Sequence, residues 1–346
     1  MSTATATVDD TVDEVAARFR DRAARVDSGD QQVVDGLRWL GERDLIAPRG
    51  GGLPYAVSLV ERIAGECMSS AFSLWAQRMV IEYLGRGEPD SGELLGELLA
   101  GRVVGSTAMA PALADVAGLG PVPVTARRAD GGLRLTGPIR WASNLFPDAV
   151  VVLPVRVGDG ADRAVVRLRL SDPGVQVDPR PELLALNGTA SSSALLRDVH
   201  VPGDAVLSWD LRAFVGSIRP TFLLVQSAFC SGLAQRSTEE TKRHLTGPNA
   251  ELTGEAELVA ARAASVHRRL HAGAADAASL SSAELLSLRL DAAAAASAAT
   301  RLEATVRGGA GYLAGSDVSR RLREGAFLPI QAPTEGQLRW ELSRSV

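Results

Sequence analysis

The character of the sequence changes twice along the chain, and this restricts the fold more than any other feature. Residues 103–208 contain short apolar runs, such as AVVVLPVRV and RAVVRLRL, that are separated by Gly, Asp and Pro. Such runs are typical of β-strands, because β-branched side chains pack well on a pleated sheet and the separating residues favour turns. Before and after this segment, apolar residues recur at three- and four-residue spacing, which predicts α-helices. The chain is therefore expected to have helices at both ends and a β region in the middle.

The helical spacing predicts several helices on the N-terminal side, over residues 12–26, 31–43, 55–84 and 92–99. The stretch 55–84 is apolar on several faces, so we expect a buried pair of helices with a break near residues 67–70. Long antiparallel helices are predicted on the C-terminal side, over residues 214–244, 255–275, 283–307 and 317–327.

These patterns predict an α+β protein with three units. They are an N-terminal helical domain (1–102), a middle β-barrel or sandwich (103–210) and a C-terminal four-helix bundle (211–346). ADGG at residues 129–132 is a hairpin signal inside the β unit, because Asp and Gly tolerate positive φ. VVGSTAMA at residues 103–110 is expected to be its first strand.

Composition excludes several classes of partner. The net charge of −4 provides no basic face, so nucleic acid is not an expected partner. The first residues, MSTATATVDDTVDEV, are polar and acidic and lack an apolar signal core. No apolar run reaches the roughly 18 residues that span a bilayer. We therefore expect a cytoplasmic protein without a membrane partner.

The two cysteines are expected to be structural. Cys67 and Cys230 lie far apart in sequence, each inside an apolar run, and match neither a disulfide framework nor a zinc-binding spacing. Buried, inert thiols are the better interpretation. No metal site is expected from the sequence.

Several motifs occur in the order found in one known family. TGPIRWASN (136–144) resembles the segment NG-x-K-x-W-I-T/S-N of the acyl-CoA dehydrogenase family, and LNGTASSSALLRDVHVP (186–202) resembles its segment ending in F-x-D-V-x-V-P. GLAQR (232–236) is similar to a helix start in the family's bundle. GGAGY (308–312) and PTEGQLRWEL (333–342) resemble its closing motifs. The resemblance implies the same three-part fold, with a flavin lying against the middle β unit, and a homodimer or homotetramer.

The resemblance also implies roles for individual residues. Trp141 would pack on the isoalloxazine ring of FAD or FMN, and Ser143 would hydrogen-bond its N5/O4 edge. A hydroxyl there suits a cofactor that gains negative charge on reduction. Taken alone, the same two residues are better interpreted as a core tryptophan and a turn serine at the end of a strand, and their register with the other motifs favours the flavin roles. The other cofactor-binding residues that the resemblance implies are Thr107, Gly308, Gly309 and Thr334, although the two glycines are also consistent with a helix-capping loop.

The position of the family's catalytic base differs here. That base is a glutamate in the motif Y-E-G-T, and the matching residue in this chain is Ala332, which cannot accept a proton. Some members place the base on the first helix of the bundle, but residues 218–230 contain no acid and Gln226 is not a base. Glu335 is the nearest carboxylate and a substitute if the loop is rearranged; a glutamate that stabilises a helix N-terminus is the alternative. The catalytic residue is therefore unknown from the sequence.

Two cofactor motifs of the family are altered as well. KRHLTGPNAELTG (242–254) lacks the Arg and Phe that hold adenine in a neighbouring subunit, and STAMAPALADVAG (106–118) replaces the motif TEPGAGSD. Three functions remain open. The chain is a flavin-dependent oxidoreductase acting on a specialised small-molecule or acyl-thioester substrate, a monooxygenase that uses FMNH2 or FADH2 from a flavin reductase, or a flavin-free scaffold with a non-redox or binding role.

Ionisable residues on the predicted bundle helices have two interpretations each. His244, His267 and His271 are solvated helix-face histidines or acid/base groups near a flavin. Arg320 and Arg321 match a family arginine that supports the flavin-side loop or the subunit interface, and surface salt bridges are the alternative.

Overall fold

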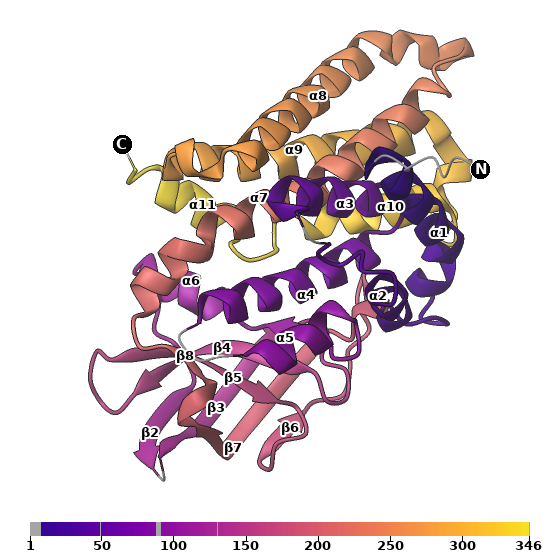
Figure 1. Cartoon of the computed structure of the whole chain (residues 1–346). Helices are drawn as coiled ribbons and strands as arrows, with labels where there is room; N and C mark the ends of the chain where they lie inside the picture. Colours follow the sequence, from indigo (N-terminus) through magenta and orange to yellow (C-terminus); the bar gives the residue numbers. More distant parts are fainter. Residues whose placement is uncertain (1–7, 49, 88–90, 130, 346) are drawn as a thin grey trace, which may run out of the picture.

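The computed structural model describes residues 8–48, 50–87, 91–129 and 131–345, and in it helices cover one side of a mixed β-sheet (Figure 1). The helices before the sheet are α1 (Val8–Asp27), α2 (Val34–Gly41), α3 (Gly52–Glu66), α4 (Met68–Arg86) and α5 (Gly92–Leu99). The predicted helix pair is confirmed, because the chain is extended at Cys67, with φ −150° and ψ 100°, between α3 and α4. Both cysteines are free and buried, and burial raises the pKa of each thiol.

The strands form one hydrogen-bonded sheet in the order β6-β7-β3-β2-β4-β5-β8, and β1 pairs with β4 outside this path. They are β1 (Gly105–Thr107), β2 (Thr125–Ala129), β3 (Gly132–Ala142), β4 (Val150–Val157), β5 (Arg163–Arg169), β6 (Val175–Val177), β7 (Ser192–Pro202) and β8 (Val206–Ser208). β1 and β2 run parallel to β4, and the other pairs are antiparallel. Side chains from β2, β3, β4, β5 and β7 share one apolar cluster, so the sheet curves around a core of its own.

Strand β4 explains why the middle of the sequence contains continuous apolar runs. Val150 and Val152 pack into the core formed by the helices, whereas Val151 and Leu153 pack into the core of the sheet. Successive side chains of a strand point to opposite faces, so a strand between two cores needs apolar residues at every position. β4 therefore joins the helical layer to the β unit.

The predicted first strand is only partly correct. Residues 105–107 form β1, but the chain then turns into the short helix α6 (Ala110–Val116) instead of continuing as a strand. Pro111 stands in the first turn of α6, where its missing N–H costs no hydrogen bond and its fixed φ favours a helix. The hairpin predicted at residues 129–132 is confirmed by the pairing of Ala129 with Gly132, while Asp130 lies outside the described residues.

The helices after the sheet are α7 (Leu211–Lys242), α8 (Thr253–Ala275), α9 (Ser282–Arg307), α10 (Asp317–Phe327) and α11 (Glu335–Leu342). Short 3-10 turns join the elements: η1 (Asn187–Thr189), η2 (Gly203–Ala205), η3 (Gly247–Leu252), η4 (Ala277–Ser279) and η5 (Gly308–Tyr312). α7 packs against α9, α8 and α3, so it is the central helix of the bundle. The predicted order of helices, β-sheet and helical bundle is confirmed.

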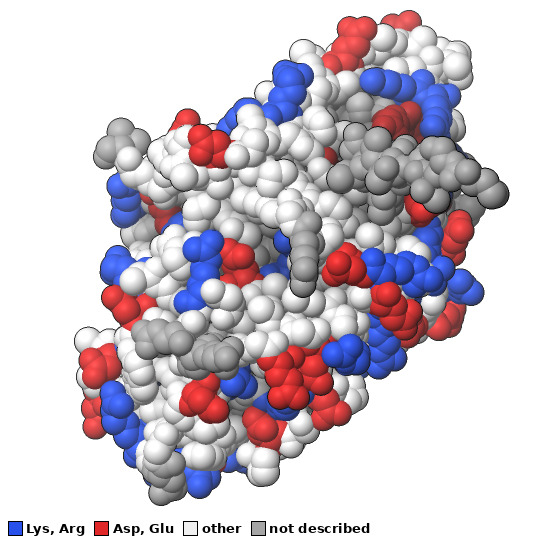
Figure 2. Space-filling view, viewed as in Figure 1, with Lys and Arg blue, Asp and Glu red and all other residues white. Residues whose placement is uncertain are grey.

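Helix α7 contains a longer apolar stretch than expected from the sequence. By length and composition it is able to cross a membrane, although no such run was expected. However, 67% of its most apolar window is buried among other elements, as in the core helix of a water-soluble bundle. On the face shown in Figure 2, acidic and basic side chains are interspersed and do not form a large area of one sign.

The motif GLAQR does not start a helix, in contrast to the prediction. It lies inside α7, which begins at Leu211. Its glycine has a packing role, because a Cβ at Gly232 would lie 1.9 Å from the backbone oxygen of Glu61 on α3. The absence of a side chain allows α3 and α7 to cross at backbone contact.

We expect Gly232→Ala to lower the free energy of unfolding by about 2 kcal/mol or more, because the added methyl group forces the two helices apart. Gly216→Ala is the matched control on the same helix, since a Cβ there meets nothing within 4 Å. That control should raise stability by about 0.5–1 kcal/mol, the usual gain of Ala over Gly in a helix. Urea denaturation of both variants measures the difference, and equal effects would contradict the close crossing.

Candidate functional site

The two motifs that carry the family resemblance meet in space at the end of β3. The hydroxyl oxygens of Ser143 and Ser191 lie 2.6 Å apart, and the backbone N–H of Asn144 donates to the carbonyl of Thr189 at 2.8 Å. Their sequence separation of 48 residues is closed by the pairing of β3 with β7. The sheet therefore brings both motifs to one edge, beside the helices.

Asn144 fixes this edge to the helical layer. Its side chain is fully buried, its backbone has φ 63°, and Ser73 on α4 donates to its Oδ1 at 2.6 Å. Its Nδ2 donates to the carbonyls of Ser73 and of Gly105 on β1, both at 3.0 Å. Asparagine adopts the left-handed conformation more readily than most residues. One amide group thus ties the turn after β3 to α4 and to β1.

A chain of hydroxyl groups sets the polarity of Ser143. Thr189 donates its hydroxyl proton to the carbonyl of Leu186 at 2.7 Å, since a carbonyl only accepts. The hydroxyl of Ser191, 2.7 Å from that of Thr189, must then donate to Thr189. Ser143 in turn must donate to Ser191, so the free lone pair of the Ser143 oxygen is left as a hydrogen-bond acceptor. Leu186 and Ala190, which flank this loop, both have positive φ, so strained backbone is concentrated here.

A cavity of about 520 Å³ lies where the β unit meets the helices. The predicted residues Trp141, Ser143, Thr107 and Ala332 all line it, although they come from separate parts of the chain. Trp141 is half exposed at 50%, whereas Ser143 is buried at 7%. The opposite side of the cavity is aromatic and is formed by Phe72, Trp75, Phe222 and Phe327.

The aromatic side of the cavity is closely packed. The rings of Phe72 and Trp75 stack with centroids 5.2 Å apart, and Phe327 and Phe222 pack edge-on against them. The indole N–H of Trp75 is buried and has no hydrogen-bond partner among the described residues. Elsewhere on the wall, Thr107 is 3.1 Å from the hydroxyl of Tyr83, whose pKa is raised by burial, so the phenol stays neutral.

A buried arginine lies behind the position of the family's base. Gln226 donates to the carbonyl of Ala332 at 2.9 Å, and Arg289 donates to the side chains of Gln226 at 3.3 Å and Gln331 at 3.0 Å. Arg289 also donates to the carbonyl of Leu328 at 3.1 Å and is fully buried. Among the described residues no carboxylate forms an ion pair with it. A buried positive charge held by neutral groups therefore lies behind Gln331 and Ala332, outside the cavity lining itself.

None of the described residues that line the cavity is Asp, Glu or His. Glu335, considered above as a substitute base, is the first residue of α11 and accepts a hydrogen bond from Arg339 at 2.8 Å. It does not line the cavity. The side of the cavity that includes Ala332 therefore offers no proton acceptor from a carboxylate or an imidazole.

The remaining predicted cofactor residues lie outside the cavity lining. Gly308 has φ 54° and ends α9, and a Cβ added at Gly308 or Gly309 would meet nothing within 4 Å. Thr334 caps α11 by accepting the backbone N–H of Gln337 at 3.2 Å. In the single chain Gly308 and Thr334 therefore act as helix caps, and Gly309 lies in the 3-10 turn η5.

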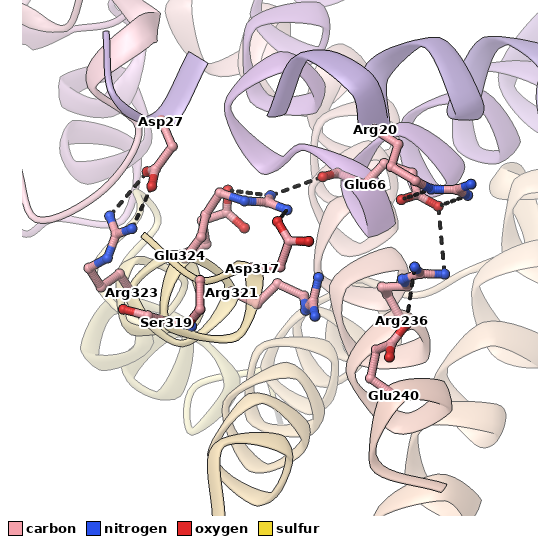
Figure 3. Close-up of polar contacts among 12 residues, drawn as sticks. Arg20, Asp27, Glu66, Arg236, Glu240, Asp317, Ser319, Arg321, Arg323 and Glu324 are labelled. Carbon is pink, nitrogen blue, oxygen red and sulfur yellow. Dashed lines mark hydrogen bonds and ion pairs between the residues drawn. The ribbon is translucent and has the colours of Figure 1, made fainter. Parts of the chain in front are cut away.

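Helix α10, which borders the cavity, is held by ion pairs (Figure 3). Arg321 makes two hydrogen bonds to Glu303, at 2.9 and 2.6 Å, and Arg320 donates to the carbonyl of Glu66 at 2.9 Å. Both arginines are about 95% buried, so the interpretation as surface salt bridges is wrong. Arg323 reaches from the rim of the cavity to Asp27 on α1, with one hydrogen bond of 3.0 Å.

Two buried groups at the site were not found from the sequence. Arg289 lies within the run LLSLRLDAAAAA, where the alanines and leucines form a core face. An arginine on that face is an available signal, because buried charges are rare without a functional or structural reason. Gln331 directly precedes Ala332 in the sequence, and nothing in the sequence connects it to Arg289.

No model of a known protein family matches this sequence, and no curated protein matches it. Solved structures match almost the whole chain. Butyryl-CoA dehydrogenase from Megasphaera elsdenii has a TM-score of 0.85 at 13% identity, covering 100% of this chain and 99% of that one. The FAD complex of PigA has a TM-score of 0.84 at 15% identity, covering 99% and 98%. FkbI, a protein for biosynthesis of a methoxymalonyl extender unit, has a TM-score of 0.79 at 20% identity, covering 96% of this chain and 97% of that one.

We expect Asn144→Ala to lower the free energy of unfolding by about 3 kcal/mol, because it leaves buried groups of Ser73 and Gly105 without partners. Asp148→Ala is the control, since Asp148 has φ 59° but is exposed. It isolates the backbone cost of alanine in this conformation, about 1 kcal/mol. Urea denaturation compares the two variants. Equal losses would show that the hydrogen bonds of Asn144 contribute little.

Proposed function

We propose that this chain, which has the acyl-CoA dehydrogenase fold, is a flavin-dependent oxidoreductase with its isoalloxazine site in the cavity between the β unit and the bundle. One observation carries the proposal. Trp141, Ser143, Thr107 and Ala332, selected from the sequence by resemblance alone, line the same cavity. The cavity volume also lies within the range of roughly 300–1,000 Å³ that is usual for small-molecule and cofactor sites.

The residues present suit a flavin. The half-exposed ring of Trp141 offers a flat apolar surface for stacking, and the hydroxyls of Ser143 and Thr107 offer polar contacts for a ring edge. The buried charge of Arg289 favours a ligand that becomes anionic, because an interaction in a low-dielectric interior is stronger than in water. A bound flavin would supply two-electron redox chemistry, while the chain would bind, orient and exclude water.

The same wall disfavours dehydrogenation of an acyl thioester. That reaction requires a group that removes the proton α to the carbonyl, and neither Ala332 nor Gln226 is able to do so. The carboxylate of Glu335 is paired with Arg339 outside the cavity. Dehydrogenation would need a base from elsewhere.

A second candidate within this class is a monooxygenase that takes up reduced flavin. The hydroxyl chain favours it, because the free position of Ser143 is an acceptor and the reduced isoalloxazine presents an N–H where the oxidised ring does not. Such an enzyme needs a flavin reductase and O2 as co-reactants, but no α-proton base. The aromatic lining favours a substrate with a large apolar part, either free or carried as a thioester.

We also propose a homo-oligomer located in the cytoplasm. Tyr312 and Leu313, which end and follow η5, are 92% and 67% exposed. Large apolar side chains with this exposure suit burial against another subunit. Dimers and tetramers both remain consistent with this surface.

We expect the chain to bind FAD, FMN or the reduced form of one of them, with tryptophan fluorescence quenching as the measure. Trp141→Ala should weaken binding about tenfold or more, since stacking and burial of the ring are lost. Trp209→Ala is the control, because Trp209 is similarly exposed at 43% and does not line the cavity. A chain that binds none of these flavins would instead be the flavin-free scaffold.

We expect Ser143→Ala to weaken binding of reduced flavin more than binding of oxidised flavin, because the lost acceptor serves an N–H of the reduced ring. Ser193→Ala is the control, since the Ser193 hydroxyl bonds Asp178 at 2.6 Å away from the cavity. Titrations with both redox forms under anaerobic conditions measure the ratio of the two dissociation constants. An unchanged ratio would contradict the assigned direction of the hydroxyl chain.

Reaction type is tested by mixing the flavin-loaded protein with acyl thioesters in the absence of oxygen. The flavin bound to the wild-type chain should keep its absorbance (no bleaching), because Ala332 supplies no base for its reduction by the thioester. Addition of a flavin reductase and O2 should instead support turnover. Ala332→Glu restores a carboxylate, and Ala332→Gln is the control of equal size. Bleaching by the glutamate variant alone would indicate that the rest of a dehydrogenase site is retained. Bleaching by the wild-type chain would overturn the monooxygenase candidate.

A further inference from the structure

A second cluster of chemically active side chains lies between α3 and α8, away from the cavity. Glu61 on α3 faces His267 and His271 on α8. Its Oε1 lies 3.0 Å from Nδ1 of His267, and its Oε2 lies 2.7 Å from Nε2 of His271. The donor atoms of the three residues are all within 4.8 Å of one another. None of the three lines the proposed flavin cavity.

The arrangement follows from helix geometry. Residues four apart lie on the same face of an α-helix, so His267 and His271 project side by side, and their ring centroids are 4.3 Å apart. Two histidines at this spacing, joined by a carboxylate from another element, form a common set of zinc ligands. His267 and His271 lie on a face of α8 and are partly exposed, as expected, and both also hydrogen-bond a buried carboxylate.

The carboxylate of Glu61 is buried but has several hydrogen-bond partners. Glu61 is 3% exposed, and Gln235 on α7 donates to its Oε1 at 2.8 Å. His267 and His271 hydrogen-bond its two oxygens, so each oxygen has at least one polar partner. Hydrogen bonds from neighbouring polar groups to a ligating carboxylate are typical of metal sites, because they orient the ligand.

The histidines leave a path for an ion from solvent. Their side chains are 41% and 33% exposed, while Glu61 forms the base of the cluster. In addition, Nδ1 of His267 lies 3.3 Å from Nε2 of Gln235 as well as 3.0 Å from Glu61. This nitrogen is able to donate to the carboxylate or accept from the amide, but not both. A cation on this nitrogen would interact with the carboxylate and the imidazole lone pair together.

We propose that Glu61, His267 and His271 bind a divalent transition-metal cation of the zinc type. Two imidazoles and one carboxylate match the preferences of such ions, and water completes the coordination. Tetrahedral zinc requires donor atoms about 3.3 Å apart, given bonds of roughly 2.0–2.1 Å. The carboxylate–ring separations of 3.0 and 2.7 Å would lengthen by a few tenths of an ångström, and any donor pair farther apart, up to the 4.8 Å that spans the cluster, would close to this spacing as the partly exposed histidines rotate.

The site would join two parts of the fold. α3 belongs to the helices that precede the sheet, and α8 is an outer helix of the bundle (Figure 1). An ion held by both would stabilise the docking of α8, since it binds the folded chain and not the unfolded one. The inference goes beyond the proposed flavin function, because neither depends on the other.

The test uses Zn²⁺ as the probe, with the metal-free full chain in equilibrium dialysis and calorimetry. We expect one ion bound per chain. His271→Ala and His267→Ala should each weaken binding at least tenfold, and Glu61→Gln should do the same without changing the size of the side chain. His244→Ala is the matched control, because the described side-chain contact of His244 is to the backbone carbonyl of Glu240 and the residue lies outside the cluster.

Thermal unfolding provides a second measure that does not depend on Glu61→Gln folding correctly. A hundredfold excess of Zn²⁺ over its Kd should raise the Tm of the wild-type chain and of His244→Ala by about 2 °C or more. Because its binding is at least tenfold weaker, the same addition should raise the Tm of His271→Ala by at most about half as much. Equal binding by His244→Ala and His271→Ala, or no binding by the wild-type chain, would overturn the proposal and leave the cluster as a hydrogen-bonded ion pair.

Discussion

The hydrogen bonds of the Asn144 side chain determine where the rest of the site can lie. One buried amide accepts from Ser73 and donates to the carbonyls of Ser73 and Gly105, so the turn after β3 is fixed to α4 and β1 at once. Trp141 and Ser143 precede this turn and are thereby directed to the junction of sheet and helices. β4 strengthens the same junction, because its alternate side chains pack into two different cores. The cavity lies at this junction, between residues of the β unit and residues of the helices.

Much of the architecture was predictable from the sequence because its causes are local. The spacing of apolar residues places α9 and α10 within a residue or two of their observed ends, and the break at Cys67 was expected between α3 and α4. The motif around Trp141 and Ser143 identified one wall of the cavity through resemblance. Helix α6 was missed because its seven residues are too few to show a helical period. GLAQR was misplaced because the close approach of α3 and α7, not a helix start, requires Gly232.

The groups that the sequence could not reveal depend on long-range contacts. Arg289 bonds Gln226 and Gln331, which lie 63 and 42 residues away, and Glu61 meets His271 across 210 residues. No local pattern records such pairings, since each partner lies on a helix whose own periodicity is ordinary. Composition offers a weak signal only, namely a polar residue on a face that is otherwise apolar. Both clusters therefore required the fold before they could be recognised.

The absence of a carboxylate at Ala332, where the resemblance places a base, and the burial of Arg289 are consistent with one another. A glutamate at that position would lie near a buried cation, which favours its ionised form and so weakens it as a proton acceptor. Behind the cavity wall, Arg289 instead holds a positive charge between Gln226 and Gln331, without a described carboxylate paired to it. Such a wall is suited to stabilising an anion rather than to removing a proton from carbon. These contacts are consistent with the proposal that the cavity favours a chemistry other than thioester dehydrogenation on an acyl-CoA dehydrogenase fold.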